Sequence, residues 1–229
     1  MAKHGKKYRD TLKLAPKTPV SLEEAIAFVK EHPGAKFDET VEIAMRLGVD
    51  YKKSDQTVRG TVSLPHGTGR TVRVIVFAAG AQADAAREAG ADEAGYDELI
   101  EKVRGGWTEF DVAIATTDAM KEVRKLGRVL GPRGLMPNPK TGTVTDDVGP
   151  AVTAAKGGRV EFRMDRTGNV SVCCGKRSFE AQKLLENILA IIEALNHERP
   201  AGAKGTFIRS CTISTTMGVG IPVVLPTKE

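Results

Sequence analysis

The sequence predicts an α+β terminal domain that is interrupted by an inserted α/β domain of Rossmann-like type. Apolar and polar residues alternate along Thr40–Arg46, as in a sheet with one solvated face. Arg73–Phe77 is instead a nearly continuous apolar run, which is typical of a strand covered on both faces. Alternation then returns at Arg159–Asp165. The simplest topology therefore has one sheet on either side of an insertion.

The elements of the terminal domain follow from capping signals and periodicity. Ser21, followed by Glu24, is a capping box that opens a helix ending at His32-Pro33-Gly34. The basic stretch around Lys6–Leu14 reads either as a helix or as a disordered arm. The remaining elements expected are a strand over 57–64, a hairpin of 159–165 and 170–174 about a tight turn at 165–169, a helix over 178–195 and a closing strand near 207–216.

Between these segments the chain alternates strands and helices. Helices are expected over 82–89, 96–104, from 118 and over 147–156, with strands at 73–77, 91–94 and 111–115. This alternation of strands and helices predicts a small parallel sheet with helices on both faces. We expect residues 1–67 and 160–229 to form one discontinuous domain around an insert at 68–159. The glycine-rich crossings form a natural paired hinge at Gly67, Gly69, Gly157 and Gly158.

Charge and cysteine content point to an intracellular protein with a polyanionic partner. The 229 residues hold 34 Lys and Arg against 29 Asp and Glu, a net charge of +5. The excess is local, because the first 18 residues carry six lysines and arginines and one acid. Three cysteines without a CxxC or Cys/His cluster indicate free thiols and no zinc site. Neither a signal peptide nor an apolar run of membrane-spanning length is apparent, so we expect a cytosolic protein.

An enzyme acting on a small molecule through the Rossmann-like insert is the alternative function. After the strand at 73–77, however, Ala78–Ala83 has one glycine where a dinucleotide fingerprint needs three, and GxxxxGK[ST] does not occur. None of the four histidines has a nucleophile beside it in sequence. We therefore expect no catalytic residue, cofactor or metal.

A nucleic-acid interface fits the polar face of the terminal-domain sheet better. Arginines supply planar forks for phosphate, and hydroxyls can meet ribose 2′-OH groups. This face collects Arg59, Thr61, Arg159, Arg163, Ser171, Thr212, Ser214 and Thr216. The acids Glu42, Glu161 and Asp165 lie among them, where they could accept hydrogen bonds from RNA. The alternative is a solvated face with ordinary charge pairs.

Gly127–Gly142 is the most distinctive stretch, with four glycines, three prolines, three basic residues and no acid. The prolines argue against a regular helix or central strand through it, whereas its apolar residues indicate that the loop packs. Either it is a structural Ω-loop that happens to be basic, or it offers charge to RNA. We rank the structural role first.

With the preceding run Asp118–Leu126, this loop resembles the signature of the bacterial-type stalk-protein family of the large ribosomal subunit. The resemblance extends to Lys36–Thr40 and Thr215–Gly218, and covers essentially the whole chain. It implies a two-domain rRNA-binding protein, in which the aromatic residue at Phe37 and the Thr-Met-Gly run contact RNA. It also implies a place at the mobile stalk near the tRNA exit site, release of deacylated tRNA, and repression of the protein's own operon mRNA.

The polar sheet face and the motifs of the resemblance together make up the expected RNA site. Its residues are Lys36, Phe37, Thr40, Glu42, Arg46, Arg59, Arg159, Arg163, Asp165, Ser171, Thr212, Ser214, Thr216, Met217 and Gly218. The expected partners are large-subunit rRNA, exit-site tRNA and the operon mRNA, with no membrane. We expect a non-enzymatic component of cytoplasmic ribosomes that is a monomer when free.

Overall fold

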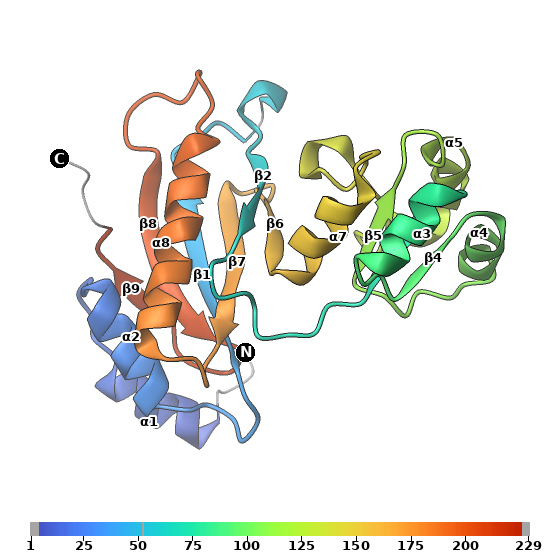
Figure 1. Ribbon diagram of the computed structural model, residues 1–229. Coiled ribbons are helices and arrows are strands. Elements are labelled where there is room, and N and C mark those ends of the chain that lie inside the picture. The colour runs from blue at the N-terminus through green and yellow to red at the C-terminus, as the bar shows by residue number, and fades with distance from the viewer. Residues whose placement is uncertain (1–4, 52, 226–229) are drawn as a thin grey trace. The chain divides into compact units, whose positions relative to one another are not determined.

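The computed structural model describes residues 5–51 and 53–225 (Figure 1). The chain folds as two compact units. The terminal unit comprises the described residues up to Gly69 and from Val160 onward, and the insert is Arg70–Arg159. The fold is mixed, because the terminal unit contains an antiparallel sheet and the insert a parallel one.

The terminal unit is built on a four-stranded antiparallel sheet. Its strand order is β7 (Asn169–Lys176), β1 (Thr40–Leu47), β8 (Ile208–Thr215), β9 (Ile221–Val223). A separate two-stranded sheet joins β2 (Arg59–Ser63) to β6 (Arg159–Arg163). The helices of the unit are α1 (Lys6–Leu14), α2 (Leu22–Glu31), the 3₁₀ turn η1 (Ser54–Gln56) and α8 (Ala181–His197).

Helices α2 and α8 cover one face of the four-stranded sheet (Figure 1). Burial alternates strictly along β1, so that Ile43 and Met45 are fully buried while Glu42 and Arg46 are exposed. The predicted capping box is confirmed, since the Ser21 hydroxyl accepts a hydrogen bond from the Glu24 amide at 3.2 Å. Strand periodicity thus fixes which face is apolar, and the opposite face is left for polar side chains.

The predicted hairpin of residues 159–174 is wrong in its pairing. The tight turn exists, with the Asp165 amide donating to the Asn169 carbonyl at 2.8 Å. However, β6 joins β2, and β7 pairs with β1. The apolar residues of β7 complete the core under α8, whereas Met164 extends the other sheet by donating its amide to the Val58 carbonyl at 2.9 Å. The edge strand β9 was not predicted; it contains Pro222, which suits only an edge.

The insert has the parallel sheet with helices on both faces that the sequence predicts. Its strand order is β4 (Glu93–Gly95), β3 (Val74–Phe77), β5 (Val112–Ala115). Alternate residues of β3 belong to two separate cores, one containing α3 (Ala81–Glu88) and α7 (Val148–Lys156), the other α4 (Asp97–Arg104) and residues of the segment that follows β5. That segment comprises α5 (Met120–Val123), η2 (Arg124–Leu126), α6 (Gly127–Leu130) and η3 (Pro139–Thr141).

The basic stretch 127–142 begins with the short helix α6, but no regular helix or strand runs through it, as its prolines predict. All of its prolines follow Gly131, so the short α6 ends before the first of them. Leu130 is fully buried, and Leu135 and Met136 pack against the same core. Arg128 and Arg133 remain exposed. Packing therefore accounts for the apolar residues of the stretch, as the structural reading of the loop requires.

Candidate nucleic-acid interface

The face of the four-stranded sheet opposite α2 and α8 carries short polar side chains in register. Glu42 on β1 lies between Cys173 on β7 and Ser214 on β8. One row further along, Ala44 lies between Ser171 and Thr212. The next row places Asn169, Arg46 and Ser210 side by side. This surface, which we call the polar face, brings together five predicted site residues: Glu42, Arg46, Ser171, Thr212 and Ser214.

The remaining predicted arginines do not belong to this face, because they lie on the two-stranded sheet. There Arg59 pairs with Glu161, with Nη2 and Oε1 2.6 Å apart. Arg163 is exposed, while Arg159 belongs to the insert and lies against Gly142. The predicted single arginine–hydroxyl face is thus two surfaces on two sheets. For Arg59 and Glu161 the reading as an ordinary charge pair holds, and such a half-exposed pair contributes little stability.

A buried carboxylate joins the two loops that flank the polar face. Glu39 has no exposed surface. Its Oε2 accepts a hydrogen bond from the Gly34 amide at 2.9 Å, and its Oε1 accepts one from the Met217 amide at 3.1 Å. A carboxylate taken out of water needs such partners, and hydrogen bonds to it are stronger than neutral ones. The loops containing Phe37 and Met217, far apart in sequence, are therefore held together.

Two threonines continue this connection at the start of β1. The Thr216 amide donates to the Thr40 carbonyl at 3.1 Å, and the Thr40 amide donates to the Thr216 hydroxyl, also at 3.1 Å. The Thr40 hydroxyl in turn accepts from Lys176 Nζ at 3.0 Å. Thr216 thus has a structural role, although its hydroxyl proton still has one bond to donate.

The joined loops present apolar side chains to solvent. Phe37 is 54% exposed and Met217 is 59% exposed. The loops approach so closely that a Cβ on Gly34 would lie 2.7 Å from the Met217 carbonyl oxygen. A Cβ on Gly218 would lie 2.1 Å from the Thr215 hydroxyl. Glycine is therefore required at both positions for the two loops that carry Phe37 and Met217 to keep this close packing.

The predicted site residue Asp165 organises the turn after β6. Its carboxylate accepts hydrogen bonds from the Thr167 amide at 2.7 Å and from the Asn169 amide at 2.8 Å. The Asn169 amide, the Thr167 hydroxyl and further bonds from both residues lower the pKa of Asp165 to about 2. The charged form is thus stabilised by the turn itself, which accounts for the acid without an RNA partner.

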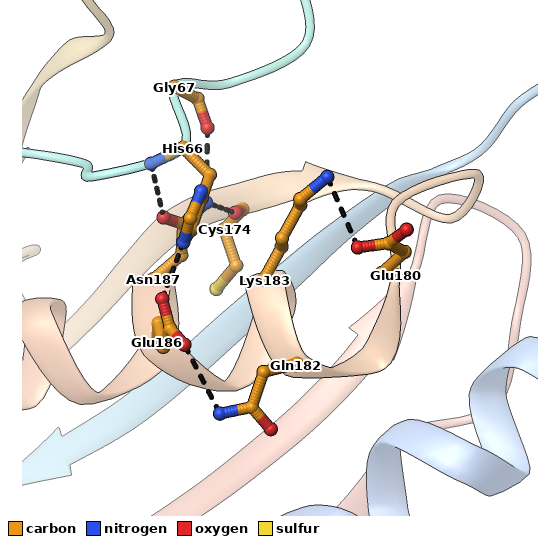
Figure 2. Close-up of polar contacts among 8 residues, drawn as sticks. All are labelled: His66, Gly67, Cys174, Glu180, Gln182, Lys183, Glu186 and Asn187. Carbon is orange, nitrogen blue, oxygen red and sulfur yellow. Dashed lines mark hydrogen bonds and ion pairs between the residues drawn. The ribbon is translucent and has the colours of Figure 1, made fainter.

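The first chain crossing between the units is fastened to α8 (Figure 2). The side chain of Asn187, which is fully buried, accepts from the His66 amide at 3.1 Å and donates to the carbonyls of Gly67 at 3.0 Å and Cys174 at 2.7 Å. His66 Nε2 lies 2.5 Å from Glu186 Oε2. The hydrogen bond from His66 and a second from Gln182 lower the pKa of Glu186. Gly67 is therefore held by the terminal unit.

The other predicted hinge glycines have distinct settings. Gly69 has a φ of +69° and a Cβ there would lie 2.7 Å from the Phe179 ring, so it too lies against the terminal unit. Gly157 ends α7, and Gly158 has a φ of +96°, which favours glycine. The first crossing is therefore held by the terminal unit as far as Gly69, and the insert begins at Arg70.

Sequence reasoning missed the two residues that organise these features. Asn187 stands within the apolar stripe of α8, between Leu184 and Ile191, and a lone amide in such a stripe is a readable signal for a buried hydrogen-bonding role. Glu39 gives no comparable signal, since an acid before a strand is ordinarily exposed.

The described residues contain no helix long and apolar enough to cross a membrane. Within the same residues no group of three or more His, Cys, Asp or Glu side chains could hold a metal ion.

The comparison with known proteins decides the family. The sequence model of the ribosomal protein L1p/L10e family matches residues 29–219, which include both joined loops, the polar face and the insert. The chain belongs to the ribosomal protein L1p/L10e family. It is 54% identical over 222 residues to the large ribosomal subunit protein uL1 of Thermobifida fusca (strain YX), covering 96% of this chain and 94% of that protein. It is 59% identical over 203 residues to the uL1 protein of Cutibacterium acnes (strain DSM 16379 / KPA171202), covering 89% and 88%.

Membership of the L1p/L10e family confirms the resemblance that the motifs indicated. The protein is a ribosomal protein and not an enzyme, so the alternative of a small-molecule enzyme is excluded.

Proposed function

We propose that this member of the L1p/L10e family binds large-subunit rRNA through the polar face and the two joined loops of the terminal unit. The names of its relatives, which are large-subunit proteins, support the choice of RNA. The observation that carries the proposal is the Glu39 bridge, because it fixes exposed Phe37 and Met217 next to a face of hydroxyls. Recognition of folded RNA uses stacking side chains together with contacts to 2′-OH groups.

The polar face supplies the complementary contacts. Short hydroxyl side chains such as Ser171, Thr212 and Ser214 let a ribose–phosphate backbone approach the sheet, and Arg46 supplies charge at one end. Glu42 stands among them as an acceptor for 2′-OH or base amine groups. Lys36, next to Phe37, and the basic α1 add positive charge near the joined loops, whereas Arg163 would supply charge on the separate two-stranded sheet. Affinity then comes from phosphate contacts, and selectivity from the joined loops.

We further infer that the RNA lies in the mobile stalk near the tRNA exit site, and that the insert moves to assist the release of deacylated tRNA. The insert is proposed to be a Rossmann-like unit, which its parallel sheet of order β4-β3-β5, with a core on each face, supports. Gly67 and Gly69 are held by the terminal unit. We therefore propose that the insert pivots from Arg70 onward at the first chain crossing and about Gly157–Gly158 at the second. The same interface is proposed to bind an operon mRNA segment that mimics the rRNA site.

Affinity ratios test the proposed interface. A stem-loop fragment of stalk rRNA and a scrambled RNA of equal length are titrated with the protein and with Phe37→Ala and Met217→Ala variants. Loss of an aromatic side chain that stacks on a base costs about 1–3 kcal/mol, so Phe37→Ala is expected to lose selectivity for the stalk fragment. Met217→Ala removes an adaptable apolar contact and is expected to lose selectivity as well. Leu189→Ala is the matched control, because Leu189 is 40% exposed on α8, which covers the other face. Equal affinity of the unchanged protein for both RNAs would overturn the proposal.

Charge is tested separately. Lys6→Ala on α1 is expected to weaken both RNAs equally and to lower the slope of log affinity against log salt by about 0.7–0.9 for each phosphate that is no longer neutralised. Thr216→Val is a poor test of RNA contact, since it also removes the acceptor of the Thr40 amide. If Lys6→Ala lost much more affinity for the stalk fragment than for the scrambled RNA, the division into charge and selectivity would be contradicted.

A further inference from the structure

A pocket of about 240 Å³ lies beside the proposed interface, within the terminal unit. Three segments line it: α1 with Lys7, Tyr8 and Thr11, the end of α2 with His32, and the loop that follows β8 with Met217. Met217 and Gly218 belong both to this pocket and to the joined loops. The pocket is therefore continuous with the proposed RNA surface, and the residues of α1 that line it are not among those the sequence predicted.

The walls suit a flat aromatic ligand. His32 stacks on Phe28, with ring centroids 4.3 Å apart and planes 21° apart, and its Nδ1 lies 3.0 Å from the Phe28 carbonyl oxygen. This bond favours the tautomer with the proton on Nδ1, which leaves Nε2 as an acceptor for a base amine. Tyr8 adds a second, half-buried ring, and Met217 adds an adaptable thioether. Aromatic rings of this kind bind nucleobases regardless of sequence.

The charge at the rim suits a nucleotide rather than a neutral ligand. Helix α1 carries Lys6, Lys7, Arg9 and Lys13 against the single acid Asp10, which pairs with Lys13 at 3.2 Å. Lys7 itself lines the pocket. A ligand with an apolar flat part and an anionic part matches this combination, and RNA bound on the adjoining loops supplies one.

We propose that the pocket receives the unstacked base of one unpaired nucleotide of the bound rRNA segment, held between Tyr8 of α1 and Met217. This rests on the proposed function. The state of α1 supports it: the helix has nine residues and none is buried, and a helix this short is marginal in water without packing. A base inserted between α1 and the joined loops supplies the missing packing and fixes the helix on the terminal unit.

The test uses the full chain and a series of stalk-rRNA fragments, each with one unpaired nucleotide replaced by an abasic site. Tyr8→Leu keeps an apolar side chain but removes the ring, and is expected to weaken binding of the intact fragment by about 5- to 150-fold. Tyr8→Phe keeps the ring and most of the affinity. One of the abasic fragments is expected to bind the unchanged protein as weakly as the intact fragment binds Tyr8→Leu. Tyr8→Leu is expected to bind that abasic fragment no more weakly than the unchanged protein does. Leu12→Ala, on α1 but outside the pocket lining, is the matched control.

The outcomes separate this proposal from the proposed function. The pocket is refuted if Tyr8→Leu binds the intact fragment as tightly as the unchanged protein does. It is also refuted if Tyr8→Leu loses the same affinity on every abasic fragment while Phe37→Ala still destroys selectivity. In either case the proposed interface stands without the pocket. If the unchanged protein does not prefer the stalk fragment to scrambled RNA, the proposed function itself fails. Amide exchange of α1 gives an independent reading: it is expected to slow on RNA binding in the unchanged protein and in Tyr8→Phe, and not in Tyr8→Leu.

Discussion

Replacement of Asn187 by leucine should destabilise the terminal unit while leaving the insert unchanged. The substitution keeps a side chain of similar size but removes the acceptor of the His66 amide and the donor to the Gly67 and Cys174 carbonyls. Cys174 is fully buried, and the register shift between Val41 and Glu42 leaves it without an opposite residue on β1. Its buried carbonyl accepts a hydrogen bond from the Asn187 side-chain amide at 2.7 Å.

The magnitude follows from this difference in burial. A buried carbonyl left unsatisfied costs about 1–3 kcal/mol, and the two half-buried groups, which water can reach, about 0.5–1 kcal/mol each. We expect a loss of roughly 2–5 kcal/mol in the free energy of unfolding of the terminal unit. For a chain of this size, about 2–4 °C per kcal/mol translates this into a fall of roughly 4–20 °C in its melting temperature.

The assay must distinguish the two units. Trp107 is the chain's single tryptophan and packs in the insert, so its fluorescence follows the insert alone. Amide exchange followed by mass spectrometry reports the terminal unit, and the His66 amide should exchange faster in Asn187→Leu. Asn196→Leu, at an exposed position of the same helix, is the matched control and should change stability by less than about 0.5 kcal/mol. If Asn187→Leu lost no more stability than this control, the claim that Asn187 fastens the first crossing to α8 would be refuted.

Three further predictions concern the terminal unit. Glu39→Gln leaves one acceptor where two loop amides are bound. We therefore expect a loss of about 1–3 kcal/mol in the free energy of unfolding, measured by urea unfolding, and a lower rRNA selectivity, measured by RNA titration. Unchanged selectivity would contradict the bridging role of Glu39. The turn lowers the pKa of Asp165 from 3.8 to about 2, so its stabilisation is present above pH 3.8 and lost as pH falls towards 2. Asp165→Asn should therefore melt below the unchanged protein at neutral pH, with a difference that shrinks between pH 4 and 2; a constant difference would contradict this. Burial raises the pKa of Cys211 to about 12 and that of Cys174 well above its usual range, so Cys173 should react first with iodoacetamide at pH 8 in the native protein, as peptide mapping would show.

Periodicity in the sequence predicts most of the elements and the faces they bury. The alternation in β1, the capping box at Ser21 and the continuous apolar run of β3 each state a local physical requirement, and each is met in the structure. Strand pairing is less accessible, because it depends on which neighbour completes a core. The turn at Asp165 correctly indicates a reversal of the chain, but not that β6 and β7 separate into different sheets.

The candidate interface is predictable to a similar degree. Hydroxyl and charged residues alternating with apolar ones place Ser171, Thr212 and Ser214 on a polar face, as observed. The connection between the loops that contain Phe37 and Met217 joins distant parts of the chain and runs through Glu39, whose burial results from tertiary packing alone. No local pattern encodes such a connection.

Amide exchange of the unchanged chain with and without the stalk-rRNA fragment tests the central claim most directly, because it locates the RNA without any substitution. The account predicts slower amide exchange on RNA binding at residues 36–40, at the residues of the polar face and at residues 214–218. It predicts little change around Leu189 on α8. Protection confined to the basic stretch 127–142 of the insert, with none at the two joined loops, would contradict it.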